Sequence, residues 1–288
     1  MANIKDLKEK IRSTKGTLKI TTAMKLVSAA KLNKAQIAIT SSKPYAEELE
    51  DTINVVSTLV KDYDHSFFHE KQSDKSLLLV ISGTKGLCGA FNSQVVKETR
   101  KFLSETKENF EVSFVGKKAK EVLEKEITLK KYYSFEKNEP TFVEFKNVIE
   151  EIVSDFEKSE YKNVYLIYNQ FNSAISFTTK LKQVLPISLI DSDREKIEKD
   201  FPYDFKYEPS PKVLLDTLVP ETLLTSLWTA QLDALASEHG SRMAAMDSAS
   251  TNCKEMVQKL TLKMNKLRQA AITTELIEVV SGAESLKG

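Results

Sequence analysis

Apolar residues in the first segment of the chain, about residues 1–60, recur at the spacing of a helix. Four of them lie three, four or seven positions apart: Ile4, Leu7, Ile11 and Leu18. This spacing places them on one face of a helix. Between Thr14 and Ala30 the sequence is rich in threonine, serine and alanine, small residues that let a second helix approach closely. We therefore expect a long N-terminal helix that packs against another helix.

The last segment, residues 211–286, carries a longer pattern of the same kind. One stripe with spacings of three and four runs from Trp228 to Ser281. A neighbouring stripe carries Leu232, Met246, Cys253, Met264, Ala271 and Val280. At about 1.5 Å per residue, such a helix is on the order of 100 Å long. Patterns of this length are typical of coiled coils, repeats or membrane spans, and the polar content excludes a span. An antiparallel coiled coil between the two ends of the chain fits best.

The main stripe of the last segment is unusual because several of its positions are polar. These positions are Glu238, Arg242, Asn252 and Lys263. A loosely packed, partly exposed helix pair would tolerate them. So would a pair that other proteins enclose without binding it tightly. Periodicity alone does not separate the two interpretations.

The middle of the chain, about residues 75–190, alternates between strand and helix patterns. Strands are expected at 77–82, 111–116, 127–134, 163–171 and 175–187, and helices at 92–110, 117–125 and 141–159. The last two strands, with a turn at Asn172 and Ser173, read as a hairpin. The other strands form βαβ-like units, which favour a mostly parallel sheet.

The expected fold class is therefore α+β or α/β. Residues 1–60 and 211–286 form one coiled-coil shaft, and residues 75–190 form a small Rossmann-like α/β domain between them. The placement of glycine and proline agrees with this division, because residues 1–43 and 221–281 contain no proline and one glycine each, Gly16 and Gly240. Few helix-breaking residues in these ranges favour long helices.

Composition adds little about function, but it limits the class of protein. Hydrophobic residues make up 41% of the 288 positions and charged residues 29%, which is ordinary for a globular protein. No run approaches the roughly 20 apolar residues that a membrane span needs, and the charged start of the chain does not resemble a signal peptide. We expect any association with a membrane to go through partner proteins.

Charge is unevenly distributed, although the formal net charge is only +1. Between Lys10 and Lys43 there are eight basic residues and no acidic residue. A helix with this composition presents a positive face to an acidic partner. One alternative is a coiled-coil adaptor that binds nucleic acid through this basic helix, which would make binding sensitive to salt. The absence of interleaved aromatic residues argues against it.

Candidate chemistry is sparse. The stretch SGTKGLCGAFN at 82–92 follows a strand and opens a helix, where phosphate-binding loops occur. It lacks both the P-loop and the dinucleotide fingerprints, so a structural turn is favoured over the alternative of a nucleotide-binding enzyme. His65 and His69 lack a third metal ligand, and Cys88 and Cys253 read as free buried thiols. We expect no catalytic site, metal or cofactor.

Blocks of sequence along the whole chain resemble the gamma subunits of rotary F-type ATP synthases. The two most specific are IRSTKGTLKITTAMKLVSAAK at 11–31 and NKLRQAAITTELIEVVSGAESL at 265–286. LLLVISGTKGLCGAFN, YEPSPKVLLDTL and ASEHGSRMAAMDSAS, which begin at 77, 207 and 236, are similar to further family blocks. The chain departs from the family at Gly83 and Lys85, where an acid and an arginine are usual. It also has Gly240 in the long helix, which we expect to soften the shaft slightly.

The resemblance implies a non-catalytic rotor part. Its two terminal helices would stand inside a ring of three alpha and three beta subunits, with catalytic sites on the beta subunits. An epsilon subunit and a membrane c-ring would be the other partners. The resemblance also implies a peripheral location on the cytoplasmic face of the bacterial inner membrane, where proton flow through the c-ring is coupled to ATP synthesis.

The resemblance further assigns roles to particular residues. A catch for a beta-subunit loop is implied for Arg268, Gln269 and Thr273, and Met24 matches a position that faces an acidic beta-subunit segment.

The remaining implied contacts lie at the two ends of the long C-terminal segment. An apolar bearing near the C-terminal tip is implied for Ile277, Val279 and Val280, and contact with the rotor ring for Tyr207 and Glu208.

Overall fold

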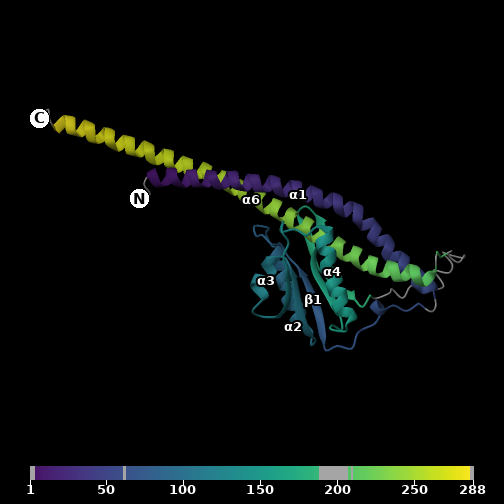
Figure 1. The fold of residues 1–288 in the computed structure, drawn as a ribbon. Helices are drawn as coiled ribbons and strands as arrows, with labels where there is room; N and C mark the ends of the chain where they lie inside the picture. The colour runs from purple at the N-terminus through teal and green to yellow at the C-terminus, as the bar shows by residue number, and fades with distance from the viewer. Residues whose placement is uncertain (1–3, 61–62, 188–206, 209, 286–288) are drawn as a thin grey trace. The chain divides into compact units, whose positions relative to one another are not determined.

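The computed structural model describes residues 4–60, 63–187, 207–208 and 210–285 (Figure 1). The helices are α1 (Ile4–Leu59), α2 (Phe91–Glu105), α3 (Lys117–Leu123), α4 (Phe142–Glu157) and α6 (Pro211–Ser285), with a 3₁₀ turn, η1 (Ser66–Phe68). The strands are β1 (Lys75–Ile81), β2 (Asn109–Val115), β3 (Thr128–Tyr133), β4 (Val164–Ser173) and β5 (Ser176–Leu185). The chain forms two compact units: residues 1–28 with 243–288, and residues 29–242.

The five strands form one sheet with the order β3-β2-β1-β4-β5. Strand β1 pairs in parallel with both β2 and β4, and β2 pairs in parallel with β3. Strand β5 is antiparallel to β4. The expected mostly parallel sheet with a terminal hairpin is therefore confirmed. The carboxyl ends of β1 and β2 lie at the same edge, where the glycine-rich turn after β1 begins.

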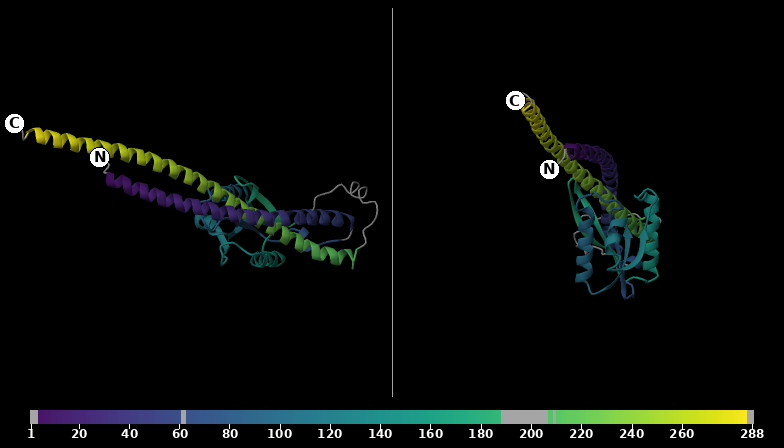
Figure 2. Two further views of the ribbon diagram at one scale, coloured as in Figure 1. Left: turned by 90° about the horizontal axis from the view of Figure 1, so that it is seen from above. Right: turned by 90° about the vertical axis from the view of Figure 1, so that its left-hand side faces the viewer.

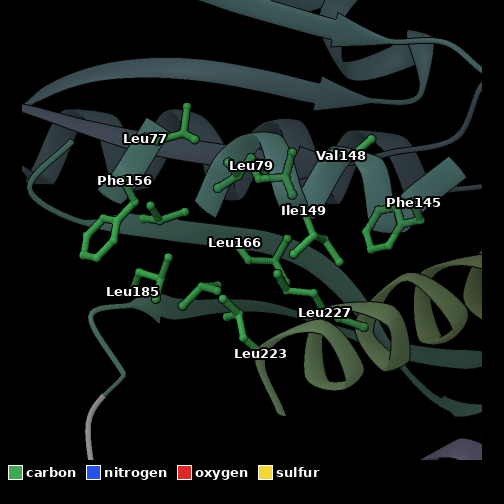
Figure 3. Packing of buried hydrophobic residues seen from close by; sticks show 14 of the residues in the cluster. Leu77, Leu79, Phe145, Val148, Ile149, Phe156, Leu166, Leu185, Leu223 and Leu227 are labelled. Atoms are coloured by element: carbon green, nitrogen blue, oxygen red, sulfur yellow. The ribbon is translucent and has the colours of Figure 1, made fainter. Parts of the chain in front are cut away.

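Helices cover both faces of this sheet in the larger unit. Alternate residues of β1 point to opposite faces: Leu78 and Val80 pack with residues of α2 and α3, whereas Leu77 and Leu79 pack with α4 and α6. Figure 3 shows this second cluster, in which Leu166 of β4 faces Leu227 of α6. The uniform burial of β1 explains why its sequence is a continuous apolar run rather than an alternating one.

Helix α4 begins where its sequence requires. The Thr141 hydroxyl accepts a hydrogen bond from the backbone N–H of Glu144, and the Glu144 carboxylate accepts one from the backbone N–H of Thr141. This capping box satisfies donors that the first helical turn leaves free. It fixes the end of the segment 134–141, which brings Glu139 to its position near α6.

In the smaller unit, the first part of α1 and the last part of α6 form an antiparallel pair, visible in Figures 1 and 2. Thr21 contacts Ser250 and Lys25 contacts Asp247, at 2.8 and 2.7 Å. Residue numbers therefore rise along α1 as they fall along α6, which confirms the antiparallel arrangement. The α6 side of the seam consists of buried or half-buried residues: Met246, Ser250, Cys253, Val257, Leu260, Met264 and Leu267.

This seam differs from the main stripe of the sequence pattern. In the smaller unit Asn252, Met256 and Lys263 are exposed, and the neighbouring stripe with Met246 and Cys253 faces α1. A straight helix turns once every 3.6 residues and drifts by about 20° per heptad relative to a seven-residue repeat. A seam that continues for many turns therefore passes from one stripe to the next.

Two boundaries in the middle of the chain were also predicted wrongly. Helix α2 ends at Glu105, not at Phe110, because Phe110 pairs with Ser76 in the sheet. The hairpin turn falls at Ala174 and Ile175 rather than at Asn172 and Ser173. Strand pairing continues to Ser173 and Ser176, and the Asn172 side-chain amide donates to the Thr178 hydroxyl across the hairpin. Residues 188–190 of the predicted domain, and residue 286, lie outside the described residues.

Candidate functional site

A buried polar network joins α6 to the turn after β1 in the larger unit. The guanidinium of Arg242 donates hydrogen bonds to the carbonyl oxygens of Gly86 and Lys85, at 3.2 and 3.3 Å, and pairs with the carboxylate of Glu238. The side chains of Arg242 and Glu238 are only 8% and 12% exposed. Their polarity in the sequence pattern thus reflects specific partners: this part of α6 is not a loosely packed seam.

The network extends to α1 through two further residues. His239 is buried, and its Nε2 lies 3.2 Å from Oε1 of Glu139. The same carboxylate oxygen binds the ammonium group of Lys31 on α1. The hydrogen bond to His239 and the contact with Lys31 lower the pKa of Glu139 to about 2, so Glu139 is negatively charged at neutral pH. We call the set Lys31, Glu139, Glu238, His239 and Arg242 the Arg242 network.

The glycine-rich turn at 82–92 is held by contacts within the protein. The backbone N–H of Gly83 donates to Oδ1 of Asn92, at 2.9 Å, and the Asn92 amide donates to the carbonyl of Lys85, at 3.4 Å. A Cβ atom at Gly83 would lie 3.0 Å from the carboxyl carbon of Glu238, so a glycine here lets the Glu238 carboxylate approach the turn. The arrangement accounts for the glycine at 83 and supports a structural turn.

Gly240 has a packing role that the sequence did not reveal. A Cβ atom there would lie 2.7 Å from the carbonyl oxygen of Ala174 in the β4–β5 hairpin. The missing side chain therefore lets the hairpin turn contact α6 directly. The low helix propensity of glycine, about 1 kcal/mol below alanine, is the local cost of this contact.

The residues expected to contact beta subunits lie in the smaller unit, and those on α6 face outward. Arg268, Gln269 and Thr273 are exposed on α6, and Met24 on α1 is half-buried. The hydroxyl of Thr273 donates to the backbone carbonyl of Gln269 one turn earlier. Arg268 has no ion pair or side-chain hydrogen bond within the described part of the chain.

The apolar residues near the end of α6 also face outward. Ile277, Val279 and Val280 are 61%, 69% and 60% exposed. Thr14 of α1 lies beside Met256 of α6, so by the antiparallel register Ile4, ten residues earlier, is level with Lys266, ten residues later. Beyond that level no described part of α1 accompanies α6. Exposed apolar residues grouped in this way mark an interaction surface.

The basic stretch of α1 is only partly neutralised. Lys25, Lys31 and Lys43 form ion pairs with Asp247, Glu139 and Glu47. Four residues nearer the N-terminus have no ion pair within the described ranges: Lys10, Arg12, Lys15 and Lys19. Lys34, in the larger unit, is exposed and also has no ion pair among the described residues. The unpaired positive charge of this stretch thus lies mostly, but not entirely, in the smaller unit.

The two residues expected at the rotor ring, Tyr207 and Glu208, lie directly before α6. Tyr207 is half-buried and Glu208 is exposed. Among the described residues, no group of histidine, cysteine or carboxylate side chains has a metal-binding arrangement, and no helix is long and apolar enough to cross a membrane. His69 pairs with Asp64 and is exposed, while Cys88 is buried and Cys253 half-buried.

The fold and these surfaces define a partner-binding protein, built from a long helical pair and an α/β domain. The ATP synthase family model matches residues 3–286. The chain is 41% identical to an ATP synthase gamma chain of Geobacter metallireducens, over the full length of both chains.

Two solved structures share the fold. The central stalk and c-ring structure of the Tetrahymena thermophila mitochondrial ATP synthase contains a chain that is 26% identical, with a TM-score of 0.59, covering 80% of this chain and 99% of that one. A chain in a Euglena gracilis mitochondrial ATP synthase structure has a TM-score of 0.66 and 20% identity, covering 98% of this chain and 94% of that one.

The chain belongs to the ATP synthase gamma-chain family. It is therefore a non-catalytic subunit of ATP synthase, and the alternatives of a nucleotide-binding enzyme and a nucleic-acid adaptor give way to this assignment. The residues expected to contact partners were assigned through resemblance to the family, and their roles stay a prediction. The role of the Arg242 network was missed, although the four-residue spacing of Glu238 and Arg242 in a seam was a signal for it.

Proposed function

We propose that this chain is the central rotor shaft of an ATP synthase. In this role it couples proton flow through a membrane rotor ring to ATP synthesis on the beta subunits. The observation that carries the proposal is the outward-facing apolar end of α6, beyond the level of Ile4, in a chain of the gamma family. Such a surface needs a partner, and a ring of three alpha and three beta subunits around the shaft would supply it.

The exposed residues of the smaller unit have distinct roles in this proposal. Arg268 and Gln269, with Thr273 one turn further on, act as a catch for a beta-subunit loop. A guanidinium suits this role because its planar fork binds carboxylate or carbonyl oxygens in a defined geometry. Met24 and the unpaired basic residues of α1 face an acidic segment of the beta subunit.

The end of α6 serves as a bearing. Apolar contacts are non-directional, so Ile277, Val279 and Val280 can remain in contact with a surrounding apolar surface as the shaft turns. A bearing built from hydrogen bonds would have to break and re-form each bond at every step. The character of this surface therefore suits rotation better than static binding.

Rotation changes nucleotide affinity because the shaft presents different faces to the three beta subunits. A contact shifts a conformational equilibrium only by the difference between its free energies in the two conformations. An Arg268 contact made with one beta conformation and lost in another provides such a difference. As the shaft turns, each beta subunit in sequence gains and loses this contact.

The Arg242 network has a mechanical role in the larger unit. It links α6 to the turn after β1, and through Glu139 it links α6 to Lys31 of α1. Force applied to the α/β domain is thereby transmitted to both helices through directional bonds. Tyr207 and Glu208 make the contact with the rotor ring, and an epsilon subunit completes the rotor. Residues 1–60 and 211–286 then act as one shaft, on the cytoplasmic face of the bacterial inner membrane.

Co-expression with the cognate alpha and beta subunits tests the proposal. We expect a stable assembly with one copy of this chain for three alpha–beta pairs, which hydrolyses magnesium-ATP. The matched pair of variants is Arg268→Ala and Lys254→Ala, both exposed positions of α6 in the smaller unit. The first should lower ATP turnover and the second should not. A chain that leaves alpha and beta subunits unassembled would contradict the proposal.

A further inference from the structure

A proline lies inside each of the two long helices, Pro44 in α1 and Pro220 in α6, both in the larger unit. The residues that follow them are bonded to each other, because the Tyr45 hydroxyl donates a 2.7 Å hydrogen bond to the Glu221 carboxylate. The two prolines therefore lie at the same level of the helix pair. Proline has no backbone N–H and its ring crowds the preceding turn, so it removes one helical hydrogen bond and bends the helix there.

The turn before each proline carries hydroxyl side chains that bond back to the helix. The hydroxyls of Thr40 and Ser41 donate to backbone carbonyls one turn earlier on α1, at 2.9 and 3.0 Å. On α6 the Thr217 hydroxyl does the same, at 3.0 Å. Such bonds favour bending, and Figure 1 shows that α1 curves toward the start of α6. Both helices are therefore weakened at one common level.

A cavity of about 220 Å³ lies beside the two prolines, between α1, α6 and the β4–β5 hairpin. Its lining includes Glu50 of α1 and Thr222 of α6, which follow the prolines within two helical turns. Figure 3 shows Leu166 of β4 and Leu223 and Leu227 of α6 pointing toward this space. Protein interiors are otherwise packed with few voids larger than a water molecule. The helices therefore have room to move toward the sheet.

The attachment of α6 to the α/β domain differs on the two sides of this cavity. Nearer the C-terminus, the buried pair of Arg242 and Glu238 binds the turn after β1 through directional bonds. Nearer the N-terminus, Leu215 and Val219 are buried in apolar surroundings, and apolar contacts are non-directional. The start of α6 can therefore shift by a small distance while the Arg242 network stays fixed.

Polar contacts across the edge of the cavity are weak. The Lys182 ammonium group of β5 donates to the Glu50 carboxylate at 3.0 Å and to the Ser226 hydroxyl at 2.9 Å. The side chains of Lys182 and Glu50 are 46% and 45% exposed, and exposed ion pairs contribute little to stability. Water can replace these bonds, so they do not fix the distance between the helices and the sheet.

We propose that Pro44 and Pro220 form a hinge, at which the end of α1 (residues 45–59) and the start of α6 (residues 211–219) move together toward the β4–β5 hairpin and back. The Tyr45–Glu221 hydrogen bond makes the two helices bend as one, and the cavity supplies the space. The use of the hinge in a rotor rests on the proposed function: a partner held at the residues directly before α6 shifts against the sheet while the Arg242 network stays intact. The bending itself belongs to the chain alone.

Spin labels on the full-length chain measure this movement as the width of a distance distribution. One label is placed at Glu48→Cys, on α1 beyond Pro44, and the other at Lys107→Cys, both exposed positions of the larger unit. Cys253→Ser removes the half-buried thiol from all variants. The pair Lys107→Cys and Lys180→Cys, both in the α/β domain, gives the width that the labels alone produce. We expect the Glu48 distribution to be broader than this reference.

Proline replacement decides whether the bend is mobile or fixed. In the double variant Pro44→Ala with Pro220→Ala, the Glu48 distribution should narrow to the width of the reference pair, because alanine restores the missing helical hydrogen bonds. Pro211→Ala is the matched control, since a proline at the first position of a helix has no helical bond to restore, and it should leave the width unchanged. Equal widths in the parent chain and the double variant, or a parent distribution no broader than the reference, would overturn the proposal.

Filling the cavity tests the space into which the helices move. Ile53→Phe or Leu227→Phe, whichever retains the cooperative unfolding transition of the parent chain, should narrow the Glu48 distribution with both prolines in place. Val96→Phe, on the opposite face of the sheet, is the control and should not. Parental width in a folded filling variant would overturn the proposal, and this result decides the matter if the double proline variant does not fold. No alpha or beta subunit takes part in these measurements, so failure of the hinge and failure of the proposed function are distinguishable.

Discussion

The hydroxyl of Ser250 on α6 donates a 2.8 Å hydrogen bond to the hydroxyl of Thr21 on α1, at a buried point of the seam in the smaller unit. The Thr21 hydroxyl in turn donates to the backbone carbonyl of Leu18. Two small polar side chains thus bring the helices close together and satisfy each other's hydrogen-bonding groups. The seam holds its register through this contact as well as through apolar packing.

Substitution at this point of the seam should separate packing from hydrogen bonding. Thr21→Val keeps the shape but leaves the Ser250 hydroxyl without an acceptor, which should lower the free energy of unfolding by about 1–3 kcal/mol. The double variant Thr21→Val with Ser250→Ala should recover part of that loss. Ser250→Leu should cost about 1–3 kcal/mol by overpacking. Denaturant unfolding of the full chain measures all three, and equal stability of the two valine variants would contradict the role of the hydrogen bond.

Disrupting the Arg242 network should destabilise the larger unit. Arg242→Met leaves the Glu238 carboxylate buried without its partner, and breaking a buried ion pair in this way costs about 3–5 kcal/mol. Adding Glu238→Gln should restore part of the loss, because the unpaired charge is then absent. Hydrogen exchange in the turn 82–92 should accelerate in the single variant, since two of its carbonyls lose the guanidinium. A change below about 0.5 kcal/mol would show that the network is not structural.

The two helical glycines Gly240 and Gly16 should respond in opposite directions to replacement by alanine. Alanine favours a helix by about 1 kcal/mol over glycine, and a Cβ atom at Gly16 meets nothing within 4 Å. Gly16→Ala should therefore raise the melting temperature. Gly240→Ala should lower it, because its Cβ atom would lie 2.7 Å from the carbonyl oxygen of Ala174. Stabilisation by both changes would show that Gly240 lowers the helix propensity of α6 without being needed for the contact with the β4–β5 hairpin.

Buried Asp233 should make the larger unit more stable as the pH falls below neutral. Burial raises the pKa of Asp233 from 3.8 to about 6, while the charge of Lys43 and a hydrogen bond from the backbone of Phe171 act in the opposite direction. The folded state then binds a proton at a pH where the unfolded state does not. By linkage, the free energy of unfolding rises as the pH falls from about 6 to about 4.

The difference between the folded and unfolded pKa values of Asp233 sets the size of this effect. It corresponds to a loss of about 3 kcal/mol in the free energy of unfolding at neutral pH. Asp233→Asn should remove this pH dependence and stabilise the chain at pH 7. Glu139→Gln is the control, because the contribution of Glu139 to the free energy of unfolding changes with pH in the opposite direction. The lowered pKa of Glu139 gives stability that is complete above its unfolded value of about 4.5 and is lost as the pH falls toward about 2. Identical pH profiles for the parent chain and Asp233→Asn would contradict the burial of a charge at this position.

Local sequence patterns were enough to predict most of the fold. The apolar runs of β1 and β4 and the four-residue and three-residue spacing in α1 each depend on neighbours in the chain. The end of α2 was misplaced because Phe110 fits either a helix or a strand, and only its pairing with Ser76 decides between them. The crossing of the α6 seam from one stripe to the next depends on the course of a partner helix.

The candidate site was predicted less completely, because its contacts join residues that are far apart in the chain. Arg242 contacts carbonyl oxygens more than 150 residues earlier in the chain, a relationship that no local pattern encodes. Gly240 is explained by a hairpin turn that sequence periodicity does not place. The prediction for the outward-facing residues Arg268, Ile277 and Val279 rests on family resemblance, because the chain's own packing gives no reason for them, and their contacts with partners stay a prediction.

The central claim is that the chain rotates as a unit inside its complex, and single-molecule rotation tests it most directly. Lys107→Cys, at an exposed position between α2 and β2, would carry a bead while the surrounding alpha and beta subunits are fixed to a surface. With magnesium-ATP we expect unidirectional rotation with three equally spaced pauses per turn, and longer pauses with Arg268→Ala. ATP hydrolysis by the assembled complex with a stationary bead on the α/β domain would contradict the account.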